Sequence, residues 1–468
     1  MTTLLAFLLY LFILVLIAGF SYKKEQTSDD FMLGSRGMNF YLTAFAAHAS
    51  DMSSWIFLAY PAAIYISGIN GISIGVGLLL FMFLNWHYIA PKLRTETEKY
   101  NCLTISSYFE SRFSDTSGML RVFSSLASLI FFTVYISGGL VSLGILLNTI
   151  FAIPYALGVV LGVLIIIPYL FIGGYVTLAW TDCFQGIFLL TAIVLVPLSA
   201  VFLFGISFES LKSMTGPTLT AVTTNTPSYY PILEILAWGL PYFGLPHVLT
   251  KFMGISDVKD MSKAKWVGIS WQAAALIAAT IIGLIGKVLY EGSTINPEYI
   301  FISMTTAMFP AFLSTFILCA ILGATITCMD SQILVVATSL AEDLYKKLIK
   351  KNATSFELLM VTRLSIFFVA TISCIIAITS STSIMSFVSY AWFGLGASFA
   401  PLVLFSLYSK TATRQGAIAG LVTGCISAAV WPLIPFPIVL PSMIPAFVLS
   451  VMAIVIGSKC FPATPSLN

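Results

Sequence analysis

The sequence predicts an all-α polytopic membrane protein, and three observations carry this prediction. Of the 468 residues, 59% are hydrophobic and only 9% are charged, with a mean hydropathy of +0.99. A soluble globule of this length needs more polar surface. Apolar runs of about 20 residues recur from end to end, which suits membrane-spanning helices, whereas barrel strands would alternate in segments of about 10 residues. The third observation is a strong asymmetry in the placement of basic residues.

We predict about thirteen transmembrane helices. Their approximate ranges are 2–21, 39–67, 70–90, 118–149, 154–174, 181–206, 229–254, 266–290, 303–345, 358–379, 383–408, 413–433 and 440–460. The first run has no basic residue before it and no small-residue cleavage site after it. We therefore interpret it as a permanent helix and not as a cleaved signal peptide.

The basic residues support both the helix count and the orientation. With the N-terminus outside, all of the 22 Lys and Arg residues except Lys212 and Lys287 fall in loops assigned to the inside. Positive charge is retained on the cytoplasmic side of membrane proteins, and a miscounted helix would invert every later loop. The pattern thus predicts an outside N-terminus and an inside C-terminus.

The connecting segments disfavour several classes of function. They are too short for a soluble domain, and no phosphate-binding loop is present, so ATP-driven pumping by this chain is not expected. The seven cysteines are scattered singly, which indicates neither a disulfide framework nor a zinc site. Segment 103–113 has the pattern of a short amphipathic helix at the inner surface, with a structural loop as the alternative.

The first anomaly lies in the second helix. Segment 46–55 places Asp51 and three serine hydroxyls in the middle of an apolar run from 40 to 66. An aspartate near the bilayer centre costs roughly 2.5–3.5 kcal/mol, so it normally faces the bundle interior or a hydrated cavity. Asp51 is therefore a candidate functional residue.

The second anomaly is the seventh helix, at 229–254. Gly239, Pro241, Gly244 and Pro246 fall within eight residues, so this helix cannot keep a continuous hydrogen-bond ladder and is expected to unwind near its middle. It follows the Asp51 helix by five helices. Interrupted helices at matching positions of two halves indicate an inverted-repeat transporter with its site at mid-membrane.

This spacing predicts the domain organisation. The expected parts are an N-terminal helix and inside loop at 1–38, a first inverted repeat at 39–206, a second inverted repeat at 229–408, and C-terminal helices and tail at 413–468. An odd unit of five helices reverses its topology between copies, which agrees with the charge map.

The third polar cluster, at 324–332, lies in the ninth helix. Thr327 and Ser331 are four residues apart and share a face. A hard cation such as Na⁺ prefers oxygen ligands, and hydroxyls facing carbonyls freed at the 49–53 break would supply them. Alternatively, these hydroxyls bond carbonyls of their own helix and only pack helices together.

At this point the residues carry a resemblance. The motifs are Ala-Ser-Asp-Met-Ser at 49–53, Thr-Leu-Ala-Trp-Thr-Asp at 177–182, the stretch 238–247, Thr-Cys-Met-Asp-Ser-Gln at 327–332 with 342–346, and Ser-Tyr-Ala-Trp at 389–392. Together they resemble the sodium:solute symporter family, most closely its sodium/proline symporters, over nearly the whole chain. The resemblance implies a LeuT-type core of two inverted five-helix repeats, with one extra N-terminal and two extra C-terminal helices.

The resemblance also implies a sodium site between the broken second helix and the ninth helix. Its ligands would be the carbonyls of Ala49, Met52 and Ala324 and the side chains of Thr327 and Cys328. Asp51 would control sodium affinity from nearby. Asp182 would lie on the route of the ion to the cytoplasm, with helix capping as the alternative.

The implied substrate pocket involves both broken helices. It would be lined by Ser53, Tyr135, Trp238, Tyr242, Pro246 and Gln332. Trp238 and Tyr242 are four apart and can form an aromatic wall, while the helix break offers N–H groups to a carboxylate. Aromatic residues at this spacing also occur as packing or lipid-facing residues.

The sequence departs from the family pattern at four positions. Cys328 stands where Ser or Thr is usual, and a neutral thiol is a poor ligand for a hard cation. Sodium could bind weakly, Ser331 or water could substitute, or the coupling could differ. Asp330 replaces a neutral residue of the proline carriers. Leu245 and Ser54 replace a polar residue and a glycine near the substrate.

The resemblance implies a sodium-coupled symporter that imports a small amino acid, L-proline first, by alternating access across a bacterial-type cytoplasmic membrane. Na⁺ would be the coupling ion, with no other cofactor, no catalytic residue, and a functional monomer. The alternatives are a symporter for another small carboxylate solute and coupling to protons through Asp51 or Asp330. A channel is disfavoured, because it would need a continuous polar stripe and the sequence has isolated polar clusters instead. An enzyme is also disfavoured, because no paired acids, histidine cluster or nucleophile with its base are visible.

Overall fold

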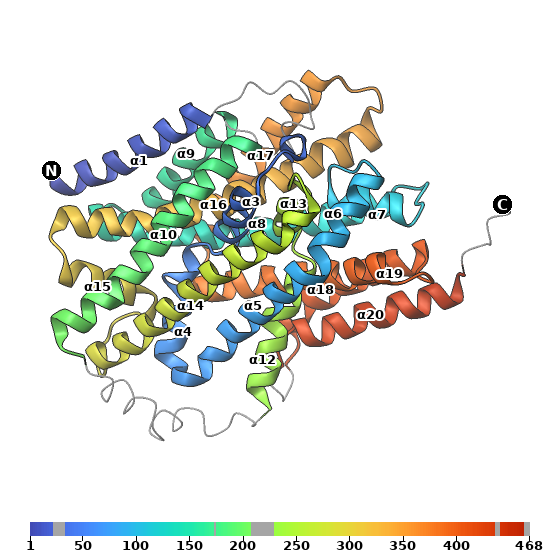
Figure 1. Cartoon of the computed structure of the whole chain (residues 1–468). Helices are drawn as coiled ribbons and strands as arrows, with labels where there is room; N and C mark the ends of the chain where they lie inside the picture. The colour runs from blue at the N-terminus through green and yellow to red at the C-terminus, as the bar shows by residue number, and fades with distance from the viewer. Residues whose placement is uncertain (22–32, 173–174, 207–228, 436–439, 463–468) are drawn as a thin grey trace.

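The computed structural model of the chain describes residues 1–21, 33–172, 175–206, 229–435 and 440–462, with only the backbone at 168–172. In these ranges the regular structure is helical, apart from one isolated bridge between Met38 and Ile255. Figure 1 shows long helices packed side by side, with α1 along one edge and α19 and α20 along another. The predicted all-α class is confirmed.

The first half of the chain contains the following elements. They are α1 (Thr2–Ser21), η1 (Gly34–Arg36), α3 (Phe40–Asp51), η2 (Ser54–Ile56), α4 (Ala59–Ser67), η3 (Gly68–Gly71), α5 (Ile72–Leu84), η4 (Asn85–Ile89), α6 (Ala90–Lys99), α7 (Ile105–Arg112), α8 (Met119–Phe151), α9 (Tyr155–Ile172) and α10 (Tyr175–Phe204).

The second half continues the same architecture. Its elements are α12 (Tyr230–Gly239), η7 (Leu240–Phe243), α13 (Pro246–Met253), η8 (Val258–Asp260), α14 (Met261–Tyr290), η9 (Pro297–Tyr299), α15 (Ile300–Met308), α16 (Ala311–Thr338), η10 (Ser339–Ile349), α17 (Ser355–Thr379), α18 (Ile384–Tyr408), α19 (Arg414–Val430), η11 (Trp431–Leu433) and α20 (Met443–Cys460).

Ten helices of the described residues are long and apolar enough to cross a membrane, or eleven if the bent pair at 230–253 is one span. Each of the thirteen expected segments overlaps a helix, but the number of spans stays a prediction. Several expected boundaries were wrong. The helix expected at 303–345 is divided, because Pro310 has an extended conformation (ψ 152°) and separates α15 from α16. The helix expected to begin at 181 begins at Tyr175.

The first break follows Asp51 directly. α3 ends there, Met52 has a ψ of 75°, and Ser53 is extended and caps η2 by accepting from the Trp55 N–H. The ψ of Met52 turns its carbonyl away from the helical direction of α3. The interruption expected at 49–53 is therefore present, and it lies at the C-terminal end of that stretch.

The second break lies between α12 and α13, whose directions differ by 46°. η7 and the extended residue Leu245 separate the two helices, as the prolines and glycines predicted. A Cβ on Gly239 would lie 2.1 Å from the ring of Phe81, and one on Gly244 would lie 2.1 Å from the Ala400 nitrogen. Glycine at these positions permits α5 and α18 to pack directly on the break.

Glycines spaced by four residues join α19 to its neighbours. A Cβ on Gly420 would lie 2.2 Å from Ile454 of α20, and one on Gly424 would lie 2.2 Å from the Ala397 carbonyl of α18. The Ser450 hydroxyl donates to the Gly420 carbonyl at 2.9 Å. Small residues allow this close approach of backbones.

We expect Gly420→Leu to destabilise the protein by about 1–3 kcal/mol, the usual cost of overpacking. The measurement is the thermal unfolding midpoint of the purified protein in detergent. Ile426→Leu, at a side chain that is 58% exposed on the same helix, is the matched control and should leave the midpoint unchanged. A Gly420→Leu midpoint equal to that of the wild type would contradict the packing argument.

Candidate functional site

The first break and the ninth predicted helix meet through Thr327. Its hydroxyl lies 2.9 Å from the Ala49 carbonyl of α3 and 3.1 Å from the Ala324 carbonyl one turn back in α16, and all three residues are fully buried. A hydroxyl has one proton, so at least one of these carbonyls keeps a free lone pair. Three of the five predicted sodium ligands therefore come together.

The hydroxyls of two neighbouring residues bond only within their own helices. Thr325 donates to the Ile321 carbonyl of its own helix at 2.7 Å, and Ser50 donates to the Ala46 carbonyl. For these two residues the packing interpretation holds. Thr327 differs because its hydroxyl also reaches across to another helix.

The other two predicted ligands are buried beside this meeting point. Met52 lies at the break itself, with its carbonyl turned out of the α3 direction. Cys328 follows Thr327 in α16, and its sulfur accepts a hydrogen bond from Gln332 Nε2 at 3.0 Å. The thiol sulfur is thus already engaged by a side chain that we had predicted to bind substrate.

Asp51 and Tyr242 join the two helix breaks. The Tyr242 hydroxyl donates to Asp51 Oδ2 at 2.6 Å, and both side chains are buried. Tyr242 was predicted to line the substrate pocket, but its hydroxyl is engaged by the carboxylate. Asp51 Oδ1 has no partner among the described residues.

Tyr242 belongs to a cluster of aromatic side chains. Trp55 stacks on Trp238 with ring centroids 6.3 Å apart, and Trp392 makes edge contacts with Tyr242 at 5.2 Å and Tyr135 at 6.5 Å. The Trp392 indole also donates to the Trp238 carbonyl at 3.0 Å. We call these five residues the aromatic cage.

Two members of the aromatic cage were not predicted to be site residues. Trp55 directly follows the polar stretch that contains Asp51, and Trp392 belongs to the motif at 389–392. Their positions in the sequence were signals, but nothing in the sequence shows that α18 packs on η7. That contact depends on the tertiary structure.

Four buried polar atoms in this region have no partner within the described part of the chain. Trp55 Nε1 and Tyr135 Oη are donors, while Asp51 Oδ1 and Gln332 Oε1 are acceptors. Tyr135 lies beside Ser53 and Cys328, which places the predicted substrate residues next to the predicted sodium ligands. Because buried polar groups are normally paired, this mixed set of unpaired donors and acceptors makes the region a candidate ligand site.

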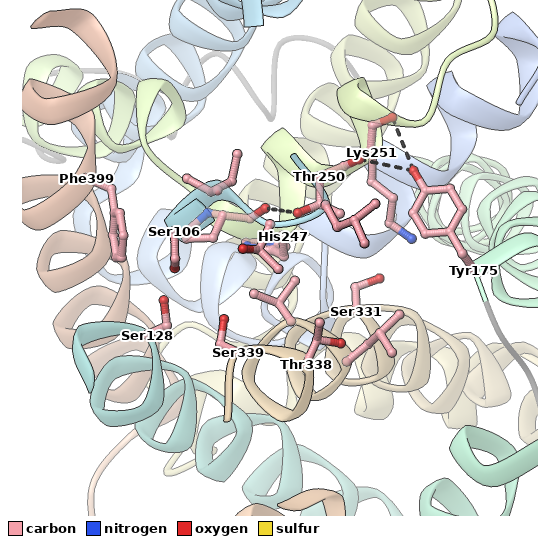
Figure 2. A pocket seen from close by; sticks show the side chains of 16 residues that line it. Ser106, Ser128, Tyr175, His247, Thr250, Lys251, Ser331, Thr338, Ser339 and Phe399 are labelled. Atoms are coloured by element: carbon pink, nitrogen blue, oxygen red, sulfur yellow. Dashed lines mark hydrogen bonds between the residues drawn. The ribbon is translucent and has the colours of Figure 1, made fainter. Parts of the chain in front are cut away.

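Two cavities flank the aromatic cage. The Lys251 cavity has a volume of about 40 Å³ (Figure 2) and is lined by hydroxyl groups, the His247 ring and the Lys251 side chain. The Glu234 cavity, of about 640 Å³, lies against α4, α8 and α12 and includes Glu298. Of the six predicted substrate residues, Pro246 lines the Lys251 cavity and the other five line neither cavity.

Two elements each run from one cavity, through the aromatic cage, to the other cavity. Along α8, Ser128 lines the Lys251 cavity, Tyr135 belongs to the cage, and Val141 lines the Glu234 cavity. The second broken helix runs past the same three places in the opposite order. Glu234 lines the Glu234 cavity, the middle of the segment lies in the cage, and Lys251 lines the Lys251 cavity. The two cavities therefore lie toward opposite ends of α8, with the cage between them.

Asp182 forms a buried ion pair with Lys251, with Lys251 Nζ 3.0 Å from Asp182 Oδ2. Asp182 is seven residues into α10, so the interpretation of this residue as a helix cap was wrong. Counting Lys251 among the loop cations was also wrong, because it lies in α13 and is 4% exposed. The ammonium also lies 5.4 Å from the Tyr175 ring centroid.

A second acid, Asp330, lies close enough to interact electrostatically with this pair. Asp330 is fully buried, and its Oδ1 accepts a hydrogen bond from the Ser331 hydroxyl at 3.2 Å. Its Oδ2 has no partner among the described residues. Two carboxylates thus share the field of one ammonium group.

The profile of the sodium:solute symporter family matches residues 31–424, which is most of the chain. The chain belongs to the sodium:solute symporter family. This family member is therefore a multi-pass membrane transporter and not an enzyme, and the coupling ion of its family is Na⁺.

Curated relatives match this family member over nearly their whole length. The high-affinity proline transporter PutP of Bacillus subtilis (strain 168) is 37% identical over 447 residues, which cover 94% of each chain. The sodium/proline symporter of Staphylococcus aureus is 37% identical over 465 residues, covering 96% of this chain and 91% of the relative.

A solved structure shows the same fold. A Na⁺-coupled sialic acid symporter in a substrate-bound outward-open state superposes with a TM-score of 0.84 over 99% of both chains, at 19% identity. The expected LeuT-type fold is therefore confirmed. This likeness concerns the fold alone.

We expect Lys251→Met to lower stability by about 3–5 kcal/mol, because it leaves the Asp182 carboxylate buried without a cation. The readout is the thermal unfolding midpoint in detergent. Lys263→Met is the control, because the Lys263–Asp260 pair (2.8 Å) involves a mostly exposed lysine and contributes little. Adding Asp182→Asn to Lys251→Met should recover most of the loss. An unchanged midpoint for Lys251→Met would contradict the pairing.

Proposed function

We propose that the protein is a symporter that couples inward movement of Na⁺ to the import of L-proline by alternating access. The observation that carries this proposal is the contact of Thr327 with the Ala49 carbonyl, which brings an α16 hydroxyl to the break after α3. Both curated relatives are named as proline carriers. Membership of a sodium-coupled family supports Na⁺ as the coupling ion, and the buried aromatic and polar residues of the site support an amino acid as the substrate.

The proposed sodium site consists of oxygen atoms at the break, with one sulfur. The carbonyls of Ala49, Met52 and Ala324 and the Thr327 hydroxyl are hard ligands that suit Na⁺. The Cys328 thiol is soft and neutral and contributes weakly. The carboxylate of Asp51, which lies between Ala49 and Met52 in the sequence, provides a negative field without coordinating the ion.

The proposed substrate site is the aromatic cage with its unpaired polar atoms. The Trp55 indole N–H and the Tyr135 hydroxyl are suited to a carboxylate, and the free oxygens of Asp51 and Gln332 are suited to an ammonium. The aromatic faces suit the apolar ring of proline. Ser53 and Pro246 complete the proposed lining, as does Tyr242 through its ring.

Alternating access follows from the position of the cage between the two cavities. The proposed repeats, 39–206 and 229–408, each contain one broken helix, with 1–38 and 413–468 outside the core. Movement of one repeat against the other would open the Glu234 cavity or the Lys251 cavity in turn. Asp182, which lies on the Lys251 side, is the proposed acid on the route of the ion to the cytoplasm.

The free energy available from one ion is sufficient for accumulation. One Na⁺ entering down an inside-negative potential of 100 mV releases about 2.3 kcal/mol, before any concentration difference is counted. Since about 1.4 kcal/mol corresponds to a factor of ten, one ion sustains roughly a fifty-fold proline gradient.

We also propose the setting of the transporter. The N-terminus lies outside and the C-terminus inside a bacterial-type cytoplasmic membrane, and the monomer is the functional unit. Under this orientation the Glu234 cavity faces outward and the Lys251 cavity faces the cytoplasm. The distribution of basic residues supports this orientation.

A second coupling ion, the proton, is favoured by one observation. Asp330 is a fully buried acid with one oxygen that has no partner among the described residues. Proton coupling would also explain the tolerance of Cys328 at the sodium site.

The test of function is uptake of radiolabelled proline into proteoliposomes, with Na⁺, Li⁺ and proton gradients imposed separately. We expect the Na⁺ gradient to drive accumulation and Asp51→Ala to abolish it, because the field at the ion site is lost. Glu291→Ala, at an exposed acid, is the control and should transport normally. Uptake driven only by protons would favour the second coupling ion, and sodium-stimulated uptake by Asp51→Ala would contradict the site.

Substitutions of the adjacent proposed ligands Thr327 and Cys328 should change the Na⁺ concentration for half-maximal uptake in opposite directions. Thr327→Val keeps the shape but removes the hydroxyl, so the Na⁺ concentration for half-maximal uptake should rise at least ten-fold. Cys328→Ser supplies a harder ligand and should lower it. Thr325→Val is the matched control, because its hydroxyl bonds only the Ile321 carbonyl of its own helix. Equal effects of the two threonine substitutions would refute the assignment.

A further inference from the structure

A line of buried polar side chains leads from η4 to Asp51. It begins at Trp86 in the π-helical turn η4, continues through His48 of α3 and Gln272 of α14, and reaches Asp51 through Tyr242 of η7. All five side chains are at most 1% exposed. We call this line the Trp86–Asp51 chain.

The direction of the first hydrogen bond is fixed by chemistry. The indole Nε1–H of Trp86 can only donate, and it lies 3.0 Å from His48 Nε2. His48 Nε2 must therefore be the accepting nitrogen. The imidazole is neutral, with its proton on Nδ1.

The next step along the line is from His48 to Gln272. The His48 Nδ1–H is a donor and the Gln272 Oε1 is an acceptor, and both atoms are buried without a hydrogen-bond partner among the described residues. The two side chains are neighbours. Gly268, one turn before Gln272, allows the His48 ring to pack directly on α14, since a Cβ there would lie 2.1 Å from His48 Nε2.

The amide of Gln272 presents its donor end to Tyr242. Its Nε2 group donates to the Tyr242 oxygen at 3.2 Å. The Tyr242 oxygen therefore accepts from Gln272. The amide NH₂ group that faces Tyr242 cannot accept a hydrogen bond from the Tyr242 hydroxyl. The single proton of Tyr242 is left to the Asp51 carboxylate, 2.6 Å away.

We propose that Gln272 is a positioning residue for sodium coupling, acting through the Tyr242 hydroxyl on the Asp51 carboxylate. This inference rests on the proposed function and deepens it. Asp51 lies between Ala49 and Met52 in the sequence, while the Tyr242 ring contacts Trp392 of the aromatic cage. The orientation of one hydroxyl thus links the ion half of the site to the substrate half, and Gln272 sets that orientation.

The experiment is a double-mutant cycle between Gln272→Leu and Tyr242→Phe. The readouts are the Na⁺ concentration for half-maximal proline uptake, and the maximal rate and half-saturating proline concentration at saturating Na⁺. We expect Gln272→Leu to raise the half-saturating Na⁺ concentration at least five-fold, with less than a two-fold change in the maximal rate. In the Tyr242→Phe background the same substitution should change nothing further, because the residue through which it acts is absent.

Gln185 provides a matched control. It is also fully buried, its Nε2 donates to the Tyr10 hydroxyl at 3.3 Å, and its Oε1 is unpaired among the described residues. No described hydrogen bond continues from Tyr10 to a carboxylate. Gln185→Leu should leave the half-saturating Na⁺ concentration within two-fold of the wild type.

Gln272→Glu covers the case in which the leucine variant does not fold. Its carboxylate keeps the shape of the side chain but draws the Tyr242 proton away from Asp51. The same rise in half-saturating Na⁺ is expected. Wild-type sodium dependence in a folded Gln272 variant, or additive effects in the cycle, would overturn the inference.

The change in tryptophan fluorescence on adding NaCl, with choline chloride as the reference salt, separates this inference from the proposed function. It reports sodium binding without proline. Failure of the wild type to transport proline would contradict the proposed substrate, while a fluorescence titration shifted by Gln272→Leu would still support the positioning role. An unshifted titration would refute that role even if proline is transported.

Discussion

The hydrogen bond from Tyr242 to Asp51 joins the two places where helices of this fold break. A break frees backbone carbonyls and N–H groups that a membrane interior cannot satisfy, so it persists only where protein or a ligand meets those groups. Here each break is held by the other through a 2.6 Å contact between side chains. The aromatic cage, the meeting of Thr327 with Ala49, and the proposed ion and substrate sites all lie around this contact.

Buried charge is distributed unevenly around the site. Lys251 neutralises Asp182 directly, and Asp330 lies in the field of the same ammonium group. Within the described part of the chain, Asp51 has no cationic partner and accepts from the neutral Tyr242 hydroxyl. A carboxylate without a cationic partner in the interior favours a cation nearby. This asymmetry supports a cation site at the first break, where the free carbonyls and the Thr327 hydroxyl also lie.

Much of the fold and part of the candidate site followed from local sequence. Two glycines and two prolines dictated the unwinding at 239–246, because neither residue type sustains a helix interior, and an isolated aspartate in an apolar run marked the first break. The family motifs pointed to Thr327 together with Ala49 and Ala324. The roles of the predicted sodium and substrate residues stay predictions, although their geometry is now described.

The sequence by itself determined the helical class, the apolar spans, the two breaks and the polar residues beside them, because hydropathy, proline and glycine act locally along the chain. Only the tertiary structure decided the partners of those residues. Lys251 looked like a loop cation, Asp182 like a possible cap, and Gln272 like an unremarkable helix residue. Their roles depend on contacts between residues that are distant in the sequence. Lys251 and Asp182 are 69 positions apart, and Gln272 and Tyr242 are 30 positions apart. Packing of whole helices sets such contacts, and no local pattern records them.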